Sequence, residues 1–308
     1  MSFPFSEKIG RAQIRKARNI FSFWGCREKR GGGGAFVERT IQFRATTRSA
    51  RAPLASSRIF DKVSSSEVIK ILMGHLHPLT QIIYTAERYF RELGFAVAEG
   101  PEIESERYNF DALNIPADHP ARAMQDTFYL KEPIGPPLHK ASKGKPLLRT
   151  HTTAVDAHYL EEHEPPFRII APGRVFRNEA TDVTHEAQFY QIDGLVVAED
   201  VHLGHLKWLL EEFYRHIFGT HLEFRWRRSF FSFVEPGVEL DIKWGGKWLE
   251  VVGAGMLHPN VFAATGRDPK KWRGLAFGTG LDRIAMIKYG ISDIRLFYGG
   301  DPRFLKQF

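Results

Sequence analysis

Residues 172–194 read PGRVFRNEATDVTHEAQFYQIDG, a polar centre between two apolar runs. The flanking runs, FRIIAPGRVFRNE and FYQIDGLVVAE, are rich in branched and aromatic residues and predict two strands joined by a polar loop. In an extended segment Arg177 and Glu179 point to one face. An arginine fork beside a carboxylate suits the binding of a phosphate and an amine together, and it equally suits a plain cross-strand salt bridge.

The composition limits the class of protein. The chain has 308 residues, enough for one large domain or two ordinary ones, and 43% of them are hydrophobic. Its single cysteine, Cys26, excludes an internal disulfide framework and a cysteine-based zinc site, which fits a reducing compartment. No run approaches 18 apolar residues, and the start lacks the apolar region of a secretory signal. We therefore expect a cytoplasmic protein without a membrane partner.

Positive charge is concentrated near the N-terminus. Residues 1–74 carry 15 Lys and Arg against 5 Asp and Glu, whereas the remainder carries 28 against 31. Residues 1–74 also lack a sustained hydrophobic period and contain GGGG, which predicts a basic, irregular segment. Such an arm suits a polyanionic partner, and a solvated tail is the alternative. We place a domain boundary there, with a folded domain over residues 75–308.

Residues 75–308 alternate between helical and extended patterns. Apolar residues at helical spacing predict a helix over residues 78–93, begun by Pro78 and ended near Gly94. A second amphipathic helix is expected over residues 203–218. Between and after them the strand-like runs cluster, including a hairpin at Gly245 and Gly246. Without regular strand–helix alternation, the pattern predicts an α+β fold with a largely antiparallel sheet flanked by helices.

The segment GTGLDR, residues 278–283, is a second candidate site. Gly278 and Gly280 remove side chains where a ligand can approach the backbone, and Arg283 follows at the start of an apolar helix. Close helix–strand packing is the alternative reading of such a glycine pair. The segment does not match the dinucleotide fingerprint, which needs a third glycine.

Two further segments carry candidate ligand-binding residues. In FFSFVEPG, Phe231 and Phe233 are predicted to share one strand face, and they form either an aromatic pocket wall or ordinary core. In LLRTHTTAV, His151 and Thr153 follow an apolar run and could recognise the charged ends of a small ligand. Alternatively, Thr153 caps the following helix.

Together, two separated arginines, a glycine-lined strand, an aromatic wall and a polar shelf suit the binding of ATP beside a small apolar amino acid. The segments GFAVAEGPEI, FRNE and GTGLDR resemble motifs 1, 2 and 3 of the class II aminoacyl-tRNA synthetases. More narrowly, the chain from about residue 75 to 308 resembles the alpha subunits of bacterial phenylalanyl-tRNA synthetases. This likeness rests on HPARAMQDTFYL, LLRTHT, RIIAPGRVFRNEATDVTHEAQFYQIDGL, FSFVEPG, KWLEVVGAGMLHPNV and FLKQF.

The resemblance implies a class II catalytic domain and an ATP site. It implies that Arg177 binds the α-phosphate and that Arg283 reaches the γ-phosphate and covers one face of adenine, with Phe189 on the other. The remaining ATP-binding residues that it implies are Glu179 near the adenine amine, His185 near the phosphates, Gly278 and Gly280. It also implies a Mg²⁺ ion with a ligand at Glu235.

The same resemblance implies a pocket for phenylalanine. Phe231 and Phe233 would pack on the substrate ring, in a pocket that is kept small. The other pocket residues implied are Val234, Gly253, Ala254 and Ala276. The ammonium and carboxylate ends would meet His151, Thr153, Gln191 and Asp193. Since such a pocket rejects an extra hydroxyl by only about 10², tyrosine would be corrected by the beta subunit.

The implied activity is that of the catalytic subunit of phenylalanine–tRNA ligase. It activates phenylalanine with ATP and transfers it to tRNA(Phe), within an α2β2 tetramer. This chain departs from the family at Asp193 and Asp282, where Glu is usual, and at Thr153, where Ser is common. Residues 1–74 show no heptads of the family's coiled-coil arm. A chain ending at Phe308 without an anticodon-binding domain favours the two-subunit bacterial type. The alternatives are a ligase of the same fold for another amino acid, and a silent paralogue that binds RNA.

Overall fold

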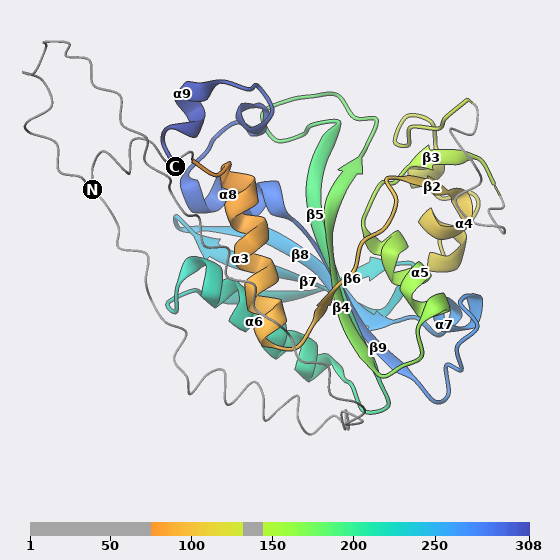
Figure 1. Cartoon of the computed structure of the whole chain (residues 1–308). Coiled ribbons are helices and arrows are strands. Elements are labelled where there is room, and N and C mark those ends of the chain that lie inside the picture. The colour runs from red at the N-terminus through yellow and green to blue at the C-terminus, as the bar shows by residue number, and fades with distance from the viewer. Residues whose placement is uncertain (1–74, 132–143) are drawn as a thin grey trace, which may run out of the picture. The chain divides into compact units, whose positions relative to one another are not determined.

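The computed structural model describes residues 75–131 and 144–308 (Figure 1). The predicted basic segment over residues 1–74, with the expected loss of the coiled-coil arm, lies outside these residues. In the described part of the chain, no helix is long and apolar enough to cross a membrane.

A seven-stranded sheet forms the centre of the described domain. Its order is β1-β4-β5-β9-β8-β7-β6, and every pairing is antiparallel except that of β1 with β4. The α+β architecture with a largely antiparallel sheet is therefore confirmed. The strands of this sheet are β1 Ala96–Val97, β4 Phe167–Phe176, β5 Gln188–Ala198, β6 Phe224–Phe231, β7 Val234–Trp244, β8 Lys247–Leu257 and β9 Arg273–Gly280.

Helices cover both faces of the sheet, and each face has its own hydrophobic cluster (Figure 1). On one face lie α3 Pro78–Glu92, α6 Leu203–Phe218, α8 Leu281–Tyr289 and α9 Pro302–Leu305. On the other lie α4 Glu106–Asn109, α5 Thr153–Glu162 and α7 Pro259–Ala264, together with the two-stranded sheet of β2 Ile103–Ser105 and β3 Pro146–Leu148. Three short 3₁₀ helices span Asp111–Leu113, Pro120–Arg122 and Ile294–Phe297.

Helix α3 shows why the sequence pattern was informative. Pro78 occupies its first turn, where a missing N–H costs nothing, and the imidazole of His77 accepts the N–H of Leu79 at 3.2 Å. Gly94 follows the helix with φ of +81°, a conformation that glycine adopts without strain. The apolar face of α3, including Ile82 and Phe90, is buried against the sheet. The predicted helix is confirmed with its C-terminal end one residue earlier.

The second amphipathic helix and the hairpin agree with the sequence pattern, whereas the strand that was expected to continue through Phe233 ends earlier. The predicted helix over 203–218 coincides with α6, and the hairpin turns at Gly245 and Gly246, both with positive φ. However, β6 ends at Phe231, and Phe233 lies in the turn before β7. The prediction that Phe231 and Phe233 share one strand face is therefore wrong, because the chain turns between them.

The close contact of β5 with β9 leads to a stability prediction. A Cβ on Gly194 would lie 2.2 Å from the nearest ring carbon of Phe277, a side chain that is 4% exposed. Overpacking a buried ring displaces the strands, so Gly194→Ala should lower the free energy of unfolding by about 3 kcal/mol. Gly299→Ala is the control, because its Cβ would meet no atom closer than 3.5 Å. Urea denaturation measures both, and equal midpoints would contradict the prediction.

Candidate active site

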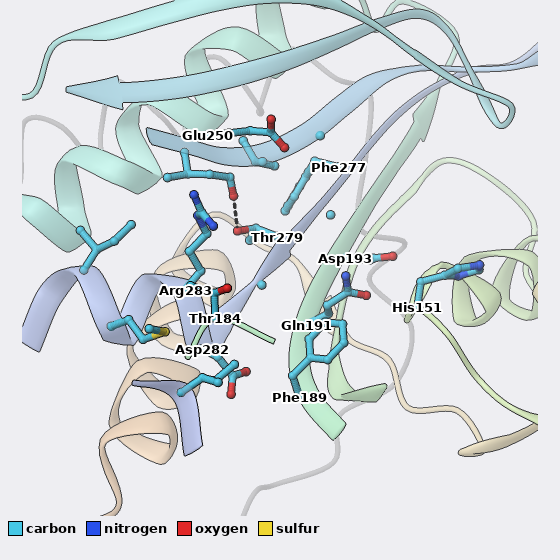
Figure 2. A pocket seen from close by; sticks show the side chains of 18 of the residues that line it. His151, Thr184, Phe189, Gln191, Asp193, Glu250, Phe277, Thr279, Asp282 and Arg283 are labelled. Carbon is cyan, nitrogen blue, oxygen red and sulfur yellow. Dashed lines mark hydrogen bonds between the residues drawn. The ribbon is translucent and has the colours of Figure 1, made fainter. Parts of the chain in front are cut away.

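A cavity of about 960 Å³ opens between the sheet and helices α5 and α8 (Figure 2). It gathers residues from widely separated parts of the chain. The residues expected from the sequence that line it are His151, Thr153, Arg177, Glu179, His185, Phe189, Gln191, Asp193, Phe231, Phe233, Gly253, Ala276, Gly278, Gly280 and Arg283. One cavity therefore contains most of the side chains that the sequence singled out.

Three expected residues do not line the cavity. Val234 and Ala254 are buried, one in each hydrophobic cluster, so they support the wall from behind. Glu235 is exposed near the start of β7 and is also absent from the lining. A different carboxylate, Glu250 of β8, lines the cavity. One of its oxygens lies 3.2 Å from the Nη2 atom of Arg227, with which it forms an ion pair.

Arg177 lies just beyond the end of β4, not within the strand, so the argument from a shared strand face does not hold for Arg177 and Glu179. Its Nε donates to the carbonyl of Thr150 at 3.4 Å, and its guanidinium carbon lies 5.0 Å from the centre of the Phe189 ring. Within residues 75–131 and 144–308 no carboxylate forms an ion pair with it at 4.0 Å or less. Burial lowers the pKa of Arg177, which still remains a cation.

Arg283 enters the cavity from the first turn of α8 (Figure 2). Its side chain is exposed, and the described residues supply neither a hydrogen bond nor an ion pair to it. Phe189 of β5 lines the same cavity. A planar ligand between them would meet an aromatic ring on one side and a guanidinium on the other, and both suit a π-system.

His185 and Glu179 belong to the exposed loop between β4 and β5. The Nδ1 atom of His185 lies 3.0 Å from an oxygen of Asp182, which also accepts the backbone N–H of Thr184 at 2.6 Å. These hydrogen bonds lower the pKa of Asp182. The loop is thereby folded on itself with Glu179 and His185 at the cavity edge.

His151 and Gln191 supply buried polar atoms to the cavity. Both ring nitrogens of His151 and the Oε1 atom of Gln191 are buried without a hydrogen bond among the described residues. Burial and the nearby charge of Arg177 lower the pKa of His151 to about 4, so its ring is neutral at pH 7. Buried polar groups are normally satisfied, so these atoms are available to a ligand.

Thr153 and Asp193 form a hydrogen bond deep in the site, in which the Thr153 hydroxyl donates to the carboxylate. Helix α5 starts at Thr153, and Thr152 is its N-cap residue without a side-chain capping bond. The alternative in which Thr153 caps the helix is therefore wrong. Burial raises the pKa of Asp193 to about 6, against the opposing effects of Thr153 and Thr152.

The floor of the cavity is made of glycines whose missing side chains leave room for others. A Cβ on Gly278 would lie 2.6 Å from an Asp193 oxygen, and one on Gly253 would lie 2.7 Å from the Phe231 ring. Gly278 and Gly253 are paired neighbours on β9 and β8. The Phe231 and Phe233 rings are 6.0 Å apart and inclined by 28°. The result is an aromatic pocket beside a buried carboxylate.

Two acids line the cavity although the sequence assigned neither of them a role in the site. Asp282 is 2% exposed and accepts the N–H of Tyr190 at 2.7 Å as well as the hydroxyl of Tyr298. Asp156 of α5 is also buried and lines the cavity. In the sequence each of these acids stands alone among apolar residues. Its burial depends on contacts with segments that are distant in the chain, so no local pattern predicts it.

A metal site made by protein alone is not found in the described residues, which contain no group of three or more His, Cys, Asp or Glu arranged to hold an ion. The exposed Glu235 does not complete one. Any Mg²⁺ here would depend mainly on oxygen ligands brought by a polyphosphate.

The fold and this cavity define a class II aminoacyl-tRNA synthetase catalytic domain, and residues 63–308 match the family of tRNA synthetases class II core domain (F). The chain belongs to this family. It is 50% identical over 253 residues to the phenylalanine–tRNA ligase alpha subunit of Zymomonas mobilis, covering 78% of this chain and 69% of the relative. The same-named subunit of Jannaschia sp. is 42% identical over 300 residues, covering 91% and 82%, and that of Vibrio cholerae is 49% identical over 240 residues, covering 78% and 69%. Within the class, the chain is thus a member of the phenylalanine–tRNA ligase alpha-subunit family.

The hydrogen bond between Thr153 and Asp193 can be tested by substitution. Thr153→Val keeps the shape and removes the donor to a buried carboxylate, so it should lower the free energy of unfolding by about 1–3 kcal/mol. The loss should be larger at pH 8, where Asp193 is ionised, than at pH 5, below its pKa of about 6. Thr153→Ser retains the hydroxyl and is the control. Urea unfolding at both pH values decides, and a pH-independent loss would contradict the assignment.

Proposed function

We propose that this chain is the catalytic alpha subunit of a phenylalanine–tRNA ligase, which forms phenylalanyl-adenylate from phenylalanine and ATP and transfers the amino acid to tRNA(Phe). The observation that carries the proposal is the meeting, in one cavity, of an aromatic pocket with a buried carboxylate and two arginines that have no ion pair among the described residues. The names of the relatives support the same activity.

In the proposed reaction a carboxylate oxygen of phenylalanine attacks the α-phosphorus of ATP, and the bond to the β-phosphate breaks to release pyrophosphate. Arg177 stabilises the negative charge that gathers on the α-phosphate, and Arg283 holds the far end of the polyphosphate. Because the nucleophile is already ionised, no general base is needed. Positioning and preorganised positive charge supply most of the acceleration.

The amino acid lies with its ring against Phe231 and Phe233 and its ammonium group toward Asp193. The polar end is completed by His151 and Gln191, whose ring nitrogens and Oε1 atom have no hydrogen-bond partner in the described part of the chain. The ionised form of Asp193 is the one that binds the ammonium. This arrangement separates an apolar end from a charged end and thereby orients the substrate for attack.

We further propose the setting in which the enzyme works. The partners are a beta subunit in an α2β2 tetramer and tRNA(Phe), and the location is the cytoplasm. Mg²⁺ accompanies ATP and offsets the charge of its phosphates. The proposed ligand Glu235 is supported by the resemblance of FSFVEPG to the family motif, although it lies outside the cavity lining.

The first test is ATP–pyrophosphate exchange with this chain alone and with the chain co-expressed with its beta subunit. We expect exchange that depends on phenylalanine and exceeds that with other amino acids in a panel. A folded complex without exchange, but with tRNA binding, would favour a silent paralogue. Preference for another amino acid would favour a different ligase of the same fold.

Both cavity arginines, Arg177 and Arg283, should be needed for activation. Arg177→Ala and Arg283→Ala should each lower kcat/KM for exchange by about 10² or more, because each removes preorganised charge from the phosphates. Arg273→Ala is the matched control, since Arg273 is an exposed arginine of β9 that does not line the cavity. If the control loses as much activity as the site variants, a general loss of charge or stability explains the effect.

The proposed role of Asp193 sets a pH dependence. Its pKa of about 6 means that protonation on acidification removes the charge that binds the ammonium. In the complex with the beta subunit, kcat/KM for phenylalanine should fall about tenfold for each pH unit below 6, since this parameter reports groups of the free enzyme. In the Asp193→Asn variant, kcat/KM for phenylalanine should not show this fall below pH 6. If the same fall of kcat/KM persists in the variant, a group other than Asp193 is responsible for it.

A further inference from the structure

The turn between β6 and β7 carries part of the aromatic pocket wall. It has two residues, Ser232 and Phe233, because the last residue of β6 pairs directly with the first of β7. The two-residue turns that best fit the twist of a hairpin need a positive φ at one or both residues. In the described part of the chain Asn114 is the one non-glycine residue with a positive φ, so neither turn residue has it. The turn therefore lacks the backbone geometry that favours a hairpin by itself.

The strand pairing on both sides of this turn is irregular. The register of β6 against β7 shifts just before Phe231, and that of β7 against β8 shifts between Val234 and Gly237. Such irregularities interrupt the ladder of backbone hydrogen bonds and are common next to active sites. Phe231 and Phe233 both line the cavity. Contacts from outside the hairpin must therefore help to fix where the two rings lie.

Two hydrogen bonds from distant segments hold the turn. The backbone N–H of His258, just before α7, donates to the carbonyl of Phe233 at 2.9 Å. The Nδ2 atom of Asn114 donates to the carbonyl of Ser232 at 2.7 Å, and its Oδ1 atom accepts from Asn260 of α7 at 2.9 Å. Because the first bond joins backbone groups, the amide of Asn114 is the side-chain group on which the position of the turn depends.

The backbone of Asn114 supports a role for its amide. Its φ of 57° and ψ of 26° place it in the left-handed region. Glycine adopts this conformation without strain, asparagine is one of the few other residues that visit it, and such residues cluster at active sites and ligand clamps. A side chain is thus retained where the backbone favours glycine, and both polar atoms of that side chain are bonded to distant segments.

We propose that Asn114 is a positioning residue for the amino-acid pocket: with its amide oriented by Asn260, it fixes the turn that carries the pocket phenylalanines and thereby the fit of the substrate ring. This inference rests on the proposed function. Neither asparagine is among the residues that line the cavity, so both act through the turn. Loss of the amide should weaken the binding of phenylalanine and leave that of ATP, whose proposed contacts come from other elements, unchanged.

The test measures KM for phenylalanine and for ATP separately, in ATP–pyrophosphate exchange by the complex with the beta subunit. Asn114→Gly removes the amide and permits the left-handed backbone. We expect its KM for phenylalanine to rise by about threefold to tenfold, the factor that corresponds to one neutral hydrogen bond. Its kcat and its KM for ATP should stay within about twofold of the wild type. An unchanged KM for phenylalanine, or an equal rise of both KM values, overturns the proposal.

A matched variant assigns the effect to the hydrogen-bond donor. Asn114→Asp keeps the shape, tolerates the left-handed backbone and keeps an acceptor for Asn260, but an ionised carboxylate cannot donate to the Ser232 carbonyl. Its KM for phenylalanine should therefore rise at least as far as that of Asn114→Gly. A wild-type KM for phenylalanine in Asn114→Asp would overturn the role of the amide.

The part played by Asn260 is tested by combining substitutions. Asn260→Ala should raise KM for phenylalanine by less than Asn114→Gly does, and it should cause no further rise when added to Asn114→Gly, because Asn260 acts through Asn114. Independent effects of the two substitutions would overturn the proposed orientation of the amide by Asn260. Absence of phenylalanine-dependent exchange in the wild-type complex would instead overturn the proposed function itself.

Discussion

Asp193 is 3% exposed on the interior strand β5. Its carboxylate accepts the hydroxyl of Thr153 from α5, and its neighbour on β9 is Gly278, which has no side chain. A charge so far from water needs compensation, and the local structure provides it. Thr153 donates a hydrogen bond, Arg149 and Arg177 contribute positive charge, and Gly278 leaves the space that the carboxyl group fills. Even so, the pKa of Asp193 is about 6, so compensation is incomplete. The remaining deficit is what a bound ammonium group would satisfy.

Most arginines of the described domain form an ion pair with a carboxylate. Arg174, Arg225 and Arg227, for example, each pair with a carboxylate at 2.8 Å or less. Arg177 and Arg283 have no such partner among the described residues, although acids are near both. A guanidinium held in place without a counter-ion is preorganised for an anionic ligand, since no existing pair must be broken first. The absence of an ion pair alone does not mark a site arginine, since Arg273 also has none among the described residues but lies outside the cavity lining. What sets Arg177 and Arg283 apart is that they lack an ion pair and line the cavity.

The sequence predicted what depends on local pattern. The period of α3, the turn at Gly245 and Gly246, and the run from β9 into α8 all follow from residues close together in the chain. The predictions that failed concern where elements end: β4 ends at Phe176, before Arg177, and β6 ends at Phe231, before the turn that holds Phe233. What the sequence did not predict at all depends on packing between distant segments. Whether Asp156 is an exposed first-turn acid or a buried cavity group is decided by how α5 packs on the sheet, and no local pattern contains that information.

The adenine site that we propose requires that Phe189 and Arg283 keep a fixed separation, although they belong to different elements. Asp282 precedes Arg283 and accepts the backbone N–H of Tyr190, which follows Phe189, at 2.7 Å. A second bond, from the hydroxyl of Tyr298, fixes the same carboxylate to the segment after α8. Burial raises the pKa of Asp282 to about 6, so this acid is held in place at an electrostatic cost. The spacing of the two faces is therefore set by one buried carboxylate and not by the flexible side chains that would contact the base.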